Sequence, residues 1–113
     1  MPDNDIVQRV IEYILTLKTG ELSELSVNKL AKIFDVNHCY LSRKFKNNTN
    51  FLLSEYINFA RIQKAQTLLK TRQDLTVNQI SQRIGYKKCQ LFRRRFKKIF
   101  GINPNHYRIL WKK

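Results

Sequence analysis

Long apolar runs and cysteines are scarce in this sequence of 113 residues. No stretch approaches the ~18 apolar residues of a membrane-spanning helix, and the first residues lack the basic start and apolar run of a signal peptide. We therefore expect a cytoplasmic protein in which Cys39 and Cys89 remain free thiols. The length allows one domain or two very small ones.

Acidic side chains are also scarce, and their scarcity is uneven. The net charge is +14, residues 36–113 carry eighteen basic and two acidic side chains, and no acid follows Leu75. A positive charge confined to one part of a chain favours a polyanionic partner, either nucleic acid or anionic lipid. Because carboxylates are few and His106 has no evident nucleophile beside it, we expect no enzyme and no cofactor.

The cysteines could instead indicate a metal site or a redox pair. His38 and Cys39 could form part of a metal site, but no further ligand lies at a metal-site spacing, so none is predicted. Cys39 and Cys89 could form a redox pair, but we expect them on separate helices, beyond the Cα separation of about 7 Å that a disulfide allows. Modification of either thiol could still block a binding surface.

The hydrophobic periodicity is helical throughout, which predicts an all-α fold of about seven helices. The first helix should follow a cap region at residues 3–5, bury residues 6, 10, 13, 14 and 17, and end at Gly20. Good N-caps precede four later segments, and Gly101 is a suitable C-terminal stop. These caps are Ser26, Asn37, Thr76 and Asn103. The apolar stripes, including Ile99 and the aromatic residues 34, 45, 92, 96, 100, 107 and 111, are expected in the core.

An internal repeat organises these helices. Residues 25–28, Leu-Ser-Val-Asn, return fifty positions later as Leu-Thr-Val-Asn at residues 75–78, and the match continues with one inserted residue. The repeated unit of cap, short helix, turn and second helix predicts two helix-turn-helix subdomains. We expect a single bilobed domain, 1–113, with the first subdomain at about 25–48, a long linker helix at about 53–70, the second subdomain at about 75–100 and a last helix at about 104–111.

The second helix of each unit should expose a polar, largely basic face. In the first copy this face holds His38, Cys39, Ser42, Arg43 and Lys46. In the second copy it holds Lys88, Cys89, Gln90, Arg93, Arg94 and Lys97. Arginine can bond bidentately to guanine and glutamine to adenine in the major groove, whereas lysines further along would bind phosphates.

The chain resembles the C-terminal DNA-binding domain of AraC/XylS-type bacterial transcription regulators. The specific motif is Ile84-Gly85-Tyr86, then Leu-Phe-Arg-Arg-Arg-Phe-Lys-Lys at 91–98, then Gly101, Pro104 and Tyr107-Arg108. The segment Tyr-Leu-Ser-Arg-Lys-Phe-Lys at 40–46 matches the first recognition helix, and Arg61, Ala65 and Leu68-Leu69 match the linker helix. The sequence departs from the family pattern at Asn50, where glycine is usual, and at Lys88 and Arg93.

The resemblance implies two recognition helices in successive major-groove segments of double-stranded DNA. Its base-reading positions fall on Cys39, Ser42, Arg43, Cys89, Gln90 and Arg94. The phosphate-binding candidates are His38, Lys46, Lys88, Arg93, Lys97 and Lys98. Arg61 is expected to tether helices instead of touching DNA.

The resemblance also implies regulation of transcription, with RNA polymerase as a second partner. We expect no membrane contact and no small-molecule site within this chain. Because the chain leaves no room for a sensing domain, it is either a stand-alone regulator or an excised domain, and we favour excision. The alternative reading is a cationic helical protein that binds nucleic acid without sequence preference, or an anionic membrane.

Overall fold

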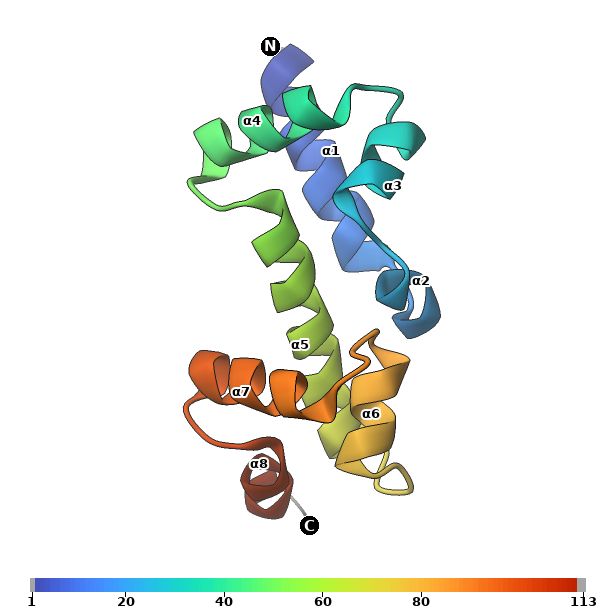
Figure 1. Ribbon diagram of the computed structural model, residues 1–113, viewed down its shortest axis with the longest axis vertical. Coiled ribbons are helices and arrows are strands. Elements are labelled where there is room, and N and C mark those ends of the chain that lie inside the picture. The colour runs from blue at the N-terminus through green and yellow to red at the C-terminus, as the bar shows by residue number, and fades with distance from the viewer. Residues whose placement is uncertain (1, 112–113) are drawn as a thin grey trace. The chain divides into compact units, whose positions relative to one another are not determined.

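The computed structural model describes the backbone of residues 2–111 and the side chains of residues 6–111. All regular secondary structure in this part of the chain is α-helical, which confirms the all-α class (Figure 1). Its helices are α1 (Pro2–Thr16), α2 (Thr19–Ser23), α3 (Val27–Ile33), α4 (His38–Thr49), α5 (Leu53–Thr71), α6 (Val77–Arg83), α7 (Cys89–Phe100) and α8 (Pro104–Trp111). Eight helices are therefore described where about seven were expected.

The additional helix is α2, and it corrects the prediction for the N-terminal segment. Helix α1 begins at Pro2, before the expected cap region, and ends at Thr16. Gly20, expected to end the first helix, lies inside α2. The Lys18 backbone N–H donates to Glu21 Oε1 at 3.1 Å, and Leu22 at 2% exposure anchors the turn in the core. A capping bond at its start and a buried leucine thus help to order these five residues.

The chain divides into two compact units after Ala60, and the boundary falls within α5. Unit 1 has its own core, to which α1, α3, α4 and the start of α5 contribute. Its completely buried residues include Val10, Leu30, Leu41 and Phe45. Tyr13 is only partly buried, at the edge, where its ring meets Phe34 edge-on at 5.7 Å.

Unit 2 is built around a chain of aromatic rings. Phe92, Phe96 and Tyr107 are buried, and the Phe96 and Tyr107 ring centroids lie 5.5 Å apart. The Tyr107 hydroxyl also accepts a hydrogen bond of 2.8 Å from Gln66 Nε2 on α5. Helix α8 is therefore joined to both α5 and α7. Ile62, which the sequence analysis did not single out, is completely buried in this core.

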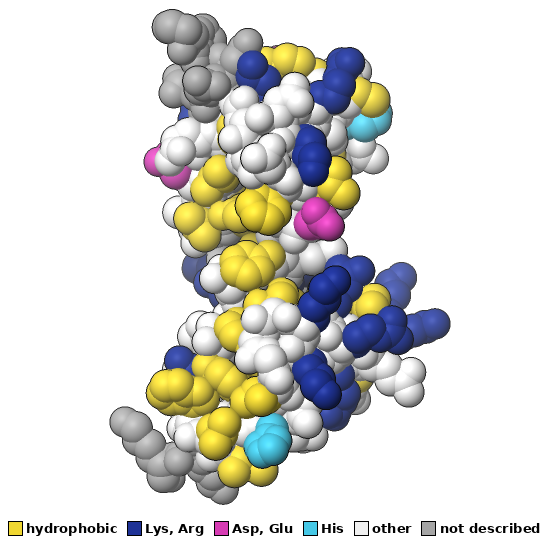
Figure 2. All heavy atoms as spheres, turned by 90° about the vertical axis from the view of Figure 1, so that its left-hand side faces the viewer, with side chains coloured by type: hydrophobic (Ala, Val, Ile, Leu, Met, Phe, Trp, Pro, Cys, Tyr) yellow, Lys and Arg dark blue, Asp and Glu magenta, His cyan; other side chains and the backbone are white. Residues whose placement is uncertain are grey.

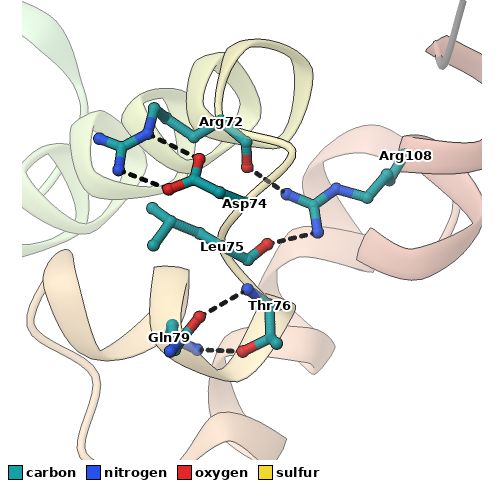
Figure 3. A network of polar contacts seen from close by, with 6 residues as sticks. All are labelled: Arg72, Asp74, Leu75, Thr76, Gln79 and Arg108. Carbon is teal, nitrogen blue, oxygen red and sulfur yellow. Dashed lines mark hydrogen bonds and ion pairs between the residues drawn. The ribbon is translucent and has the colours of Figure 1, made fainter.

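Arg108 fastens α8 to the segment that leads into α6 (Figure 3). Its guanidinium donates to three main-chain carbonyls: Leu69 at 3.3 Å, Arg72 at 3.0 Å and Leu75 at 2.6 Å. These are carbonyls of the α5 C-terminal region and of the residue before the α6 cap, and those at a helix end have no partner within the helix. Arg108 thereby fixes the turn from which the second helix-turn-helix starts.

The expectation that the apolar stripes are all committed to a core is wrong. Ile99 is 39% exposed and Trp111 is 54% exposed, although both were expected to be buried. Other large apolar side chains lie on the surface as well, among them Leu15, Phe51, Leu52, Phe59, Ile109 and Leu110. Helical spacing shows which residues share a face, but the length of the neighbouring helices decides which faces are covered.

Candidate nucleic-acid interface

Local hydrogen bonds set the geometry of the first helix pair, α3 and α4. Ser26 Oγ accepts from the Lys29 N–H at 3.1 Å and so caps α3. Asn37 Oδ1 accepts from the N–H groups of Cys39 and Tyr40, at 2.8 and 3.2 Å, and so begins α4. Both predicted caps are confirmed, and each satisfies backbone donors that a helix start leaves free.

The second pair, α6 and α7, repeats the side-chain cap of the first helix but not that of the second. Thr76 and Gln79 bond reciprocally, Gln79 N–H to Thr76 Oγ1 at 3.0 Å and Thr76 N–H to Gln79 Oε1 at 2.8 Å, which is a capping box. At the start of α7, Lys88 occupies the cap position without a capping side-chain bond. The start of α7 therefore keeps backbone N–H groups that its cap residue leaves unbonded.

The turns of the two pairs match bond for bond. The Val36 N–H donates to the Ala31 carbonyl at 2.9 Å, and the Tyr86 N–H donates to the Ser81 carbonyl at the same distance. Both turns place a residue at positive φ, Asp35 at 56° and Gly85 at 100°. Ala31 on α3 and Ser81 on α6, small residues that accept these bonds, are 4% and 0% exposed.

Helices α4 and α7 also end alike. Asn50 and Gly101 both have left-handed backbone conformations, with φ of 67° and 86°. Their N–H groups donate to the carbonyls of Lys46 and Lys97, at 2.8 and 2.7 Å. The two second helices are thus the same structural element built twice. Asn50, which departs from the family's usual glycine, adopts the conformation that glycine favours.

In unit 1, the outer face of α4 carries the candidate contact residues. Leu41 and Phe45 are completely buried, and the candidates lie on the other side of the helix. His38, Cys39, Arg43 and Lys46 are exposed, and Ser42 is half-buried. Lys46 Nζ donates to the Asn50 carbonyl at 2.9 Å, so this side chain also caps its own helix.

In unit 2, the outer face of α7 is denser in positive charge. Phe92 and Phe96 are completely buried, and the exposed candidates are Lys88, Gln90, Arg94, Lys97 and Lys98. Arg93 is half-buried, and Cys89 is partly buried against the unit 2 core. Cys89 is therefore less accessible than its counterpart Cys39. In Figure 2, Lys and Arg side chains gather on one side of the lower unit, which is unit 2.

A buried tyrosine, Tyr86, and two arginines, Arg61 and Arg95, form a further cluster in unit 2. Tyr86 is 6% exposed, and burial raises the pKa of its hydroxyl, while the nearby charges of Arg95 and Arg61 oppose that rise. Burial, more than the neighbouring Arg95 charge, lowers the pKa of the half-buried Arg61. The half-buried position of Arg61 fits the expectation that it links helices instead of contacting DNA. Arg95 lies in the matched motif, but nothing in the sequence pattern distinguished it from its neighbours.

Within the described residues, no group of three or more His, Cys, Asp or Glu side chains could hold a metal ion. Cys39 Sγ lies 3.5 Å from His38 Nε2, which is the contact expected of sequence neighbours on one helix turn. No helix of this part of the chain is long and apolar enough to cross a membrane. What the two outer faces offer is cationic and hydrogen-bonding groups on projecting helices.

A fold of two matched helix-turn-helix units is typical of transcription regulators that bind DNA. Residues 30–109 match the family described as a helix-turn-helix domain. The chain belongs to this family, in its AraC/XylS-type branch, as the resemblance had implied.

Individual relatives agree with this assignment. The chain is 37% identical over 86 residues to an HTH-type transcriptional regulator, YtdP, of Bacillus subtilis. This match covers 76% of this chain and 11% of that protein. It is 30% identical over 105 residues to the lactose operon transcription activator of Staphylococcus xylosus, covering 93% of this chain and 36% of that protein.

A solved structure supports the same fold. The C-terminal domain of AraT, a response regulator from Geobacillus stearothermophilus, has 31% sequence identity to this chain and a TM-score of 0.78. The comparison covers 93% of this chain and 84% of that domain. The curated relatives are much longer than the matched region, since the chain spans about a third of the activator and a smaller share of YtdP.

Proposed function

We propose that the protein binds double-stranded DNA sequence-specifically and regulates bacterial transcription. Its helices α4 and α7 would enter successive major-groove segments, about 34 Å apart, which is one turn of the duplex. The observation that carries this proposal is the duplicated geometry. Two helices with matched turns and matched ends each bury an apolar pair and present basic and amide side chains outward.

The proposed contacts divide into those that read bases and those that hold phosphates. The base-reading residues are Cys39, Ser42, Arg43, Cys89, Gln90 and Arg94. The phosphate-binding residues are His38, Lys46, Lys88, Arg93, Lys97 and Lys98. Arg43 and Arg94 are the strongest candidates of the first set because both are exposed and arginine bonds guanine bidentately. The half-buried Cys89 would contribute mainly shape.

RNA polymerase is the proposed second partner, on the basis of the family's usual mode of activation. The single bilobed domain of residues 1–113 is likewise proposed as the unit that binds one asymmetric DNA site. The helix pairs α3–α4 and α6–α7 support the proposed subdomains at about 25–48 and about 75–100.

Selection from a random duplex pool at about physiological salt tests the proposal. Two enriched blocks one helical turn apart would support reading by both helices. One block would assign base reading to a single unit and phosphate binding to the other. Salt-sensitive binding without any enrichment would overturn sequence-specific recognition in favour of the non-specific alternative.

A further inference from the structure

Helix α8 and the end of α7 leave an apolar surface uncovered in unit 2. We call it the C-terminal apolar surface and define it by Ile99, Ile109, Leu110 and Trp111. Their exposed fractions are 39%, 68%, 66% and 54%. Single exposed apolar residues are normal, but a group of large ones on a small unit marks an interaction surface. Figure 2 shows hydrophobic side chains gathered at the lower end of unit 2.

This surface is anchored to the core of unit 2. The ring centroids of Trp111 and Tyr107 lie 6.0 Å apart, and those of Tyr107 and Phe100 lie 5.9 Å apart. Lys70 Nζ on α5 lies 4.4 Å from the Trp111 ring centroid, within the range of a cation–π interaction. Trp111 is thus held from two sides while half of its surface remains open. A fixed aromatic side chain loses little conformational entropy when a partner covers it.

The net charge of unit 2 restricts what can cover this surface. From Arg61 onward the sequence has fifteen basic residues and one acidic residue, Asp74. Asp74 is already paired with Arg72, Oδ2 to Nη2 at 2.8 Å. A second copy of the chain would bring like charges together. An apolar segment that carries carboxylates complements both the uncovered side chains and the positive field.

The geometry points to docking of an acidic amphipathic helix from a partner protein on the C-terminal apolar surface. None of the four residues of this surface is a proposed base-reading residue, so the inference does not depend on base reading, although Ile99 on α7 directly follows the proposed phosphate contact Lys98. A lipid surface fits less well, because α8 has only eight residues and its exposed positions also include the polar Asn105 and His106. A short helix packing against a few anchors needs no broad apolar face.

Two labelled peptides and the full chain test this inference. The first is an 18-residue peptide with leucine at helical spacing i, i+3, i+4 and i+7 and glutamate elsewhere. The second has the same composition with its leucines scattered around the helix. Binding is followed by peptide anisotropy and by the emission of Trp111, the one tryptophan of the chain. Both titrations are repeated with saturating duplex DNA, which occupies the proposed reading faces.

The expected result is binding of the patterned peptide that shifts Trp111 emission to shorter wavelength and persists with duplex DNA present. Leu110→Ser should weaken this binding about tenfold, since it removes one buried leucine contact. The matched control Leu15→Ser alters a side chain of similar exposure (58%) in unit 1 and should leave binding unchanged.

Four results would overturn the inference. Equal binding of both peptides would mean that charge alone attracts them. Loss of peptide binding when DNA is added would place the peptide on the reading faces. Concentration-dependent self-association, or vesicles of anionic lipid shifting Trp111 emission where the patterned peptide does not, would identify a different occupant. None of these results bears on duplex selection, so this inference and the proposed function can fail separately.

Discussion

Arg43 and Arg94 occupy the same place on their two helices. Each follows a completely buried residue, Leu41 or Phe92, by two positions, and this spacing puts the guanidinium on the opposite side of an α-helix. Both arginines are exposed. Their equivalence means that α4 and α7 expose the same hydrogen-bond donor at the same position of the repeated unit.

Arg43→Ala and Arg94→Ala should each lower affinity for the selected duplex by about 1–3 kcal/mol and relax preference at a few base pairs. Fluorescence anisotropy on preferred and scrambled duplexes measures both effects. Lys98→Ala is the matched control, because a phosphate contact should weaken binding to every duplex alike. It is a cleaner control than Lys46→Ala, which also removes the bond to the Asn50 carbonyl. If the arginine variants lose affinity equally on all sequences, the assigned reading residues are wrong.

Gly101 isolates the cost of a left-handed backbone. Its φ is +86°, and a Cβ added there would meet no atom within 4 Å, so Gly101→Ala is strained by backbone conformation alone. We expect a loss of about 1 kcal/mol in the free energy of unfolding, measured by urea denaturation. Gly20→Ala is the control, because its added Cβ also meets nothing but Gly20 lies within α2. There alanine should stabilise by roughly 0.5 kcal/mol. Equal effects at the two positions would contradict the argument.

Helix α8 acts on the second helix-turn-helix through main-chain contacts. Arg108 reaches three carbonyls around the end of α5 and the start of α6, while Tyr107 bonds Gln66 and packs on α7. The element that supports α7 is therefore outside the helix-turn-helix itself.

Arg108→Lys should lower the free energy of unfolding of unit 2 by about 2 kcal/mol, even though it keeps the charge. An ammonium group cannot serve three carbonyls with the planar fork of a guanidinium, and hydrogen bonds to charged groups are worth about 1.5–3 kcal/mol. Amide hydrogen exchange of α6 and α7 measures the loss. The control Arg83→Lys changes an exposed arginine and should leave exchange unaltered. Unchanged protection in Arg108→Lys would show that the three bonds are dispensable.

The loop before α6 should be sensitive to acid. The Arg72 hydrogen bond is the main cause that lowers the pKa of Asp74 from 3.8 to about 2. Because the folded pKa is the lower one, the pair stabilises the fold fully above about pH 4, and this contribution is lost as the pH falls toward 2. Asp74→Asn should remove this part of the acid dependence, which thermal unfolding between pH 2 and 5 would reveal. An Asp74 carboxyl that titrates near 3.8 by NMR would contradict the pairing.

The sequence predicted the two helix pairs well because their signals are local. Ser26, Asn37 and Thr76 cap through neighbours at most three positions away, and periodicity identified the buried pairs. The start of α1 and the presence of α2 were missed, the latter because five residues are too short to show a period. The Arg108 contacts span 33 to 39 positions, so no local pattern reveals them. Which apolar faces stay open likewise depends on tertiary neighbours.

At the scale of the whole molecule, charge is the dominant property. The net charge is +14, and Lys97 and Lys98 extend the positive face of α7 beyond the proposed base-reading positions. Binding to any duplex should therefore fall steeply with salt, because each neutralised phosphate releases counterions.

Replacing both Lys97 and Lys98 by alanine should reduce the slope of log K against log salt by about 2, equally on preferred and random duplexes. The preferred-to-random affinity ratio should stay the same, because neither side chain is proposed to read bases. Titrations at four salt concentrations measure both quantities. A changed ratio with an unchanged slope would assign these lysines to base reading.

The Arg108 contacts have a consequence for how this family can diverge. All three acceptors are carbonyl oxygens, which every amino acid supplies, so the contacts do not depend on which side chains stand at positions 69, 72 and 75. Burial in the core of unit 2, and not Arg108, is what restricts Leu69 and Leu75 to apolar types. Substitutions at these positions should therefore not be correlated with position 108 across homologues. Methods that infer contacts from correlated substitutions would miss this connection between α8 and the start of α6.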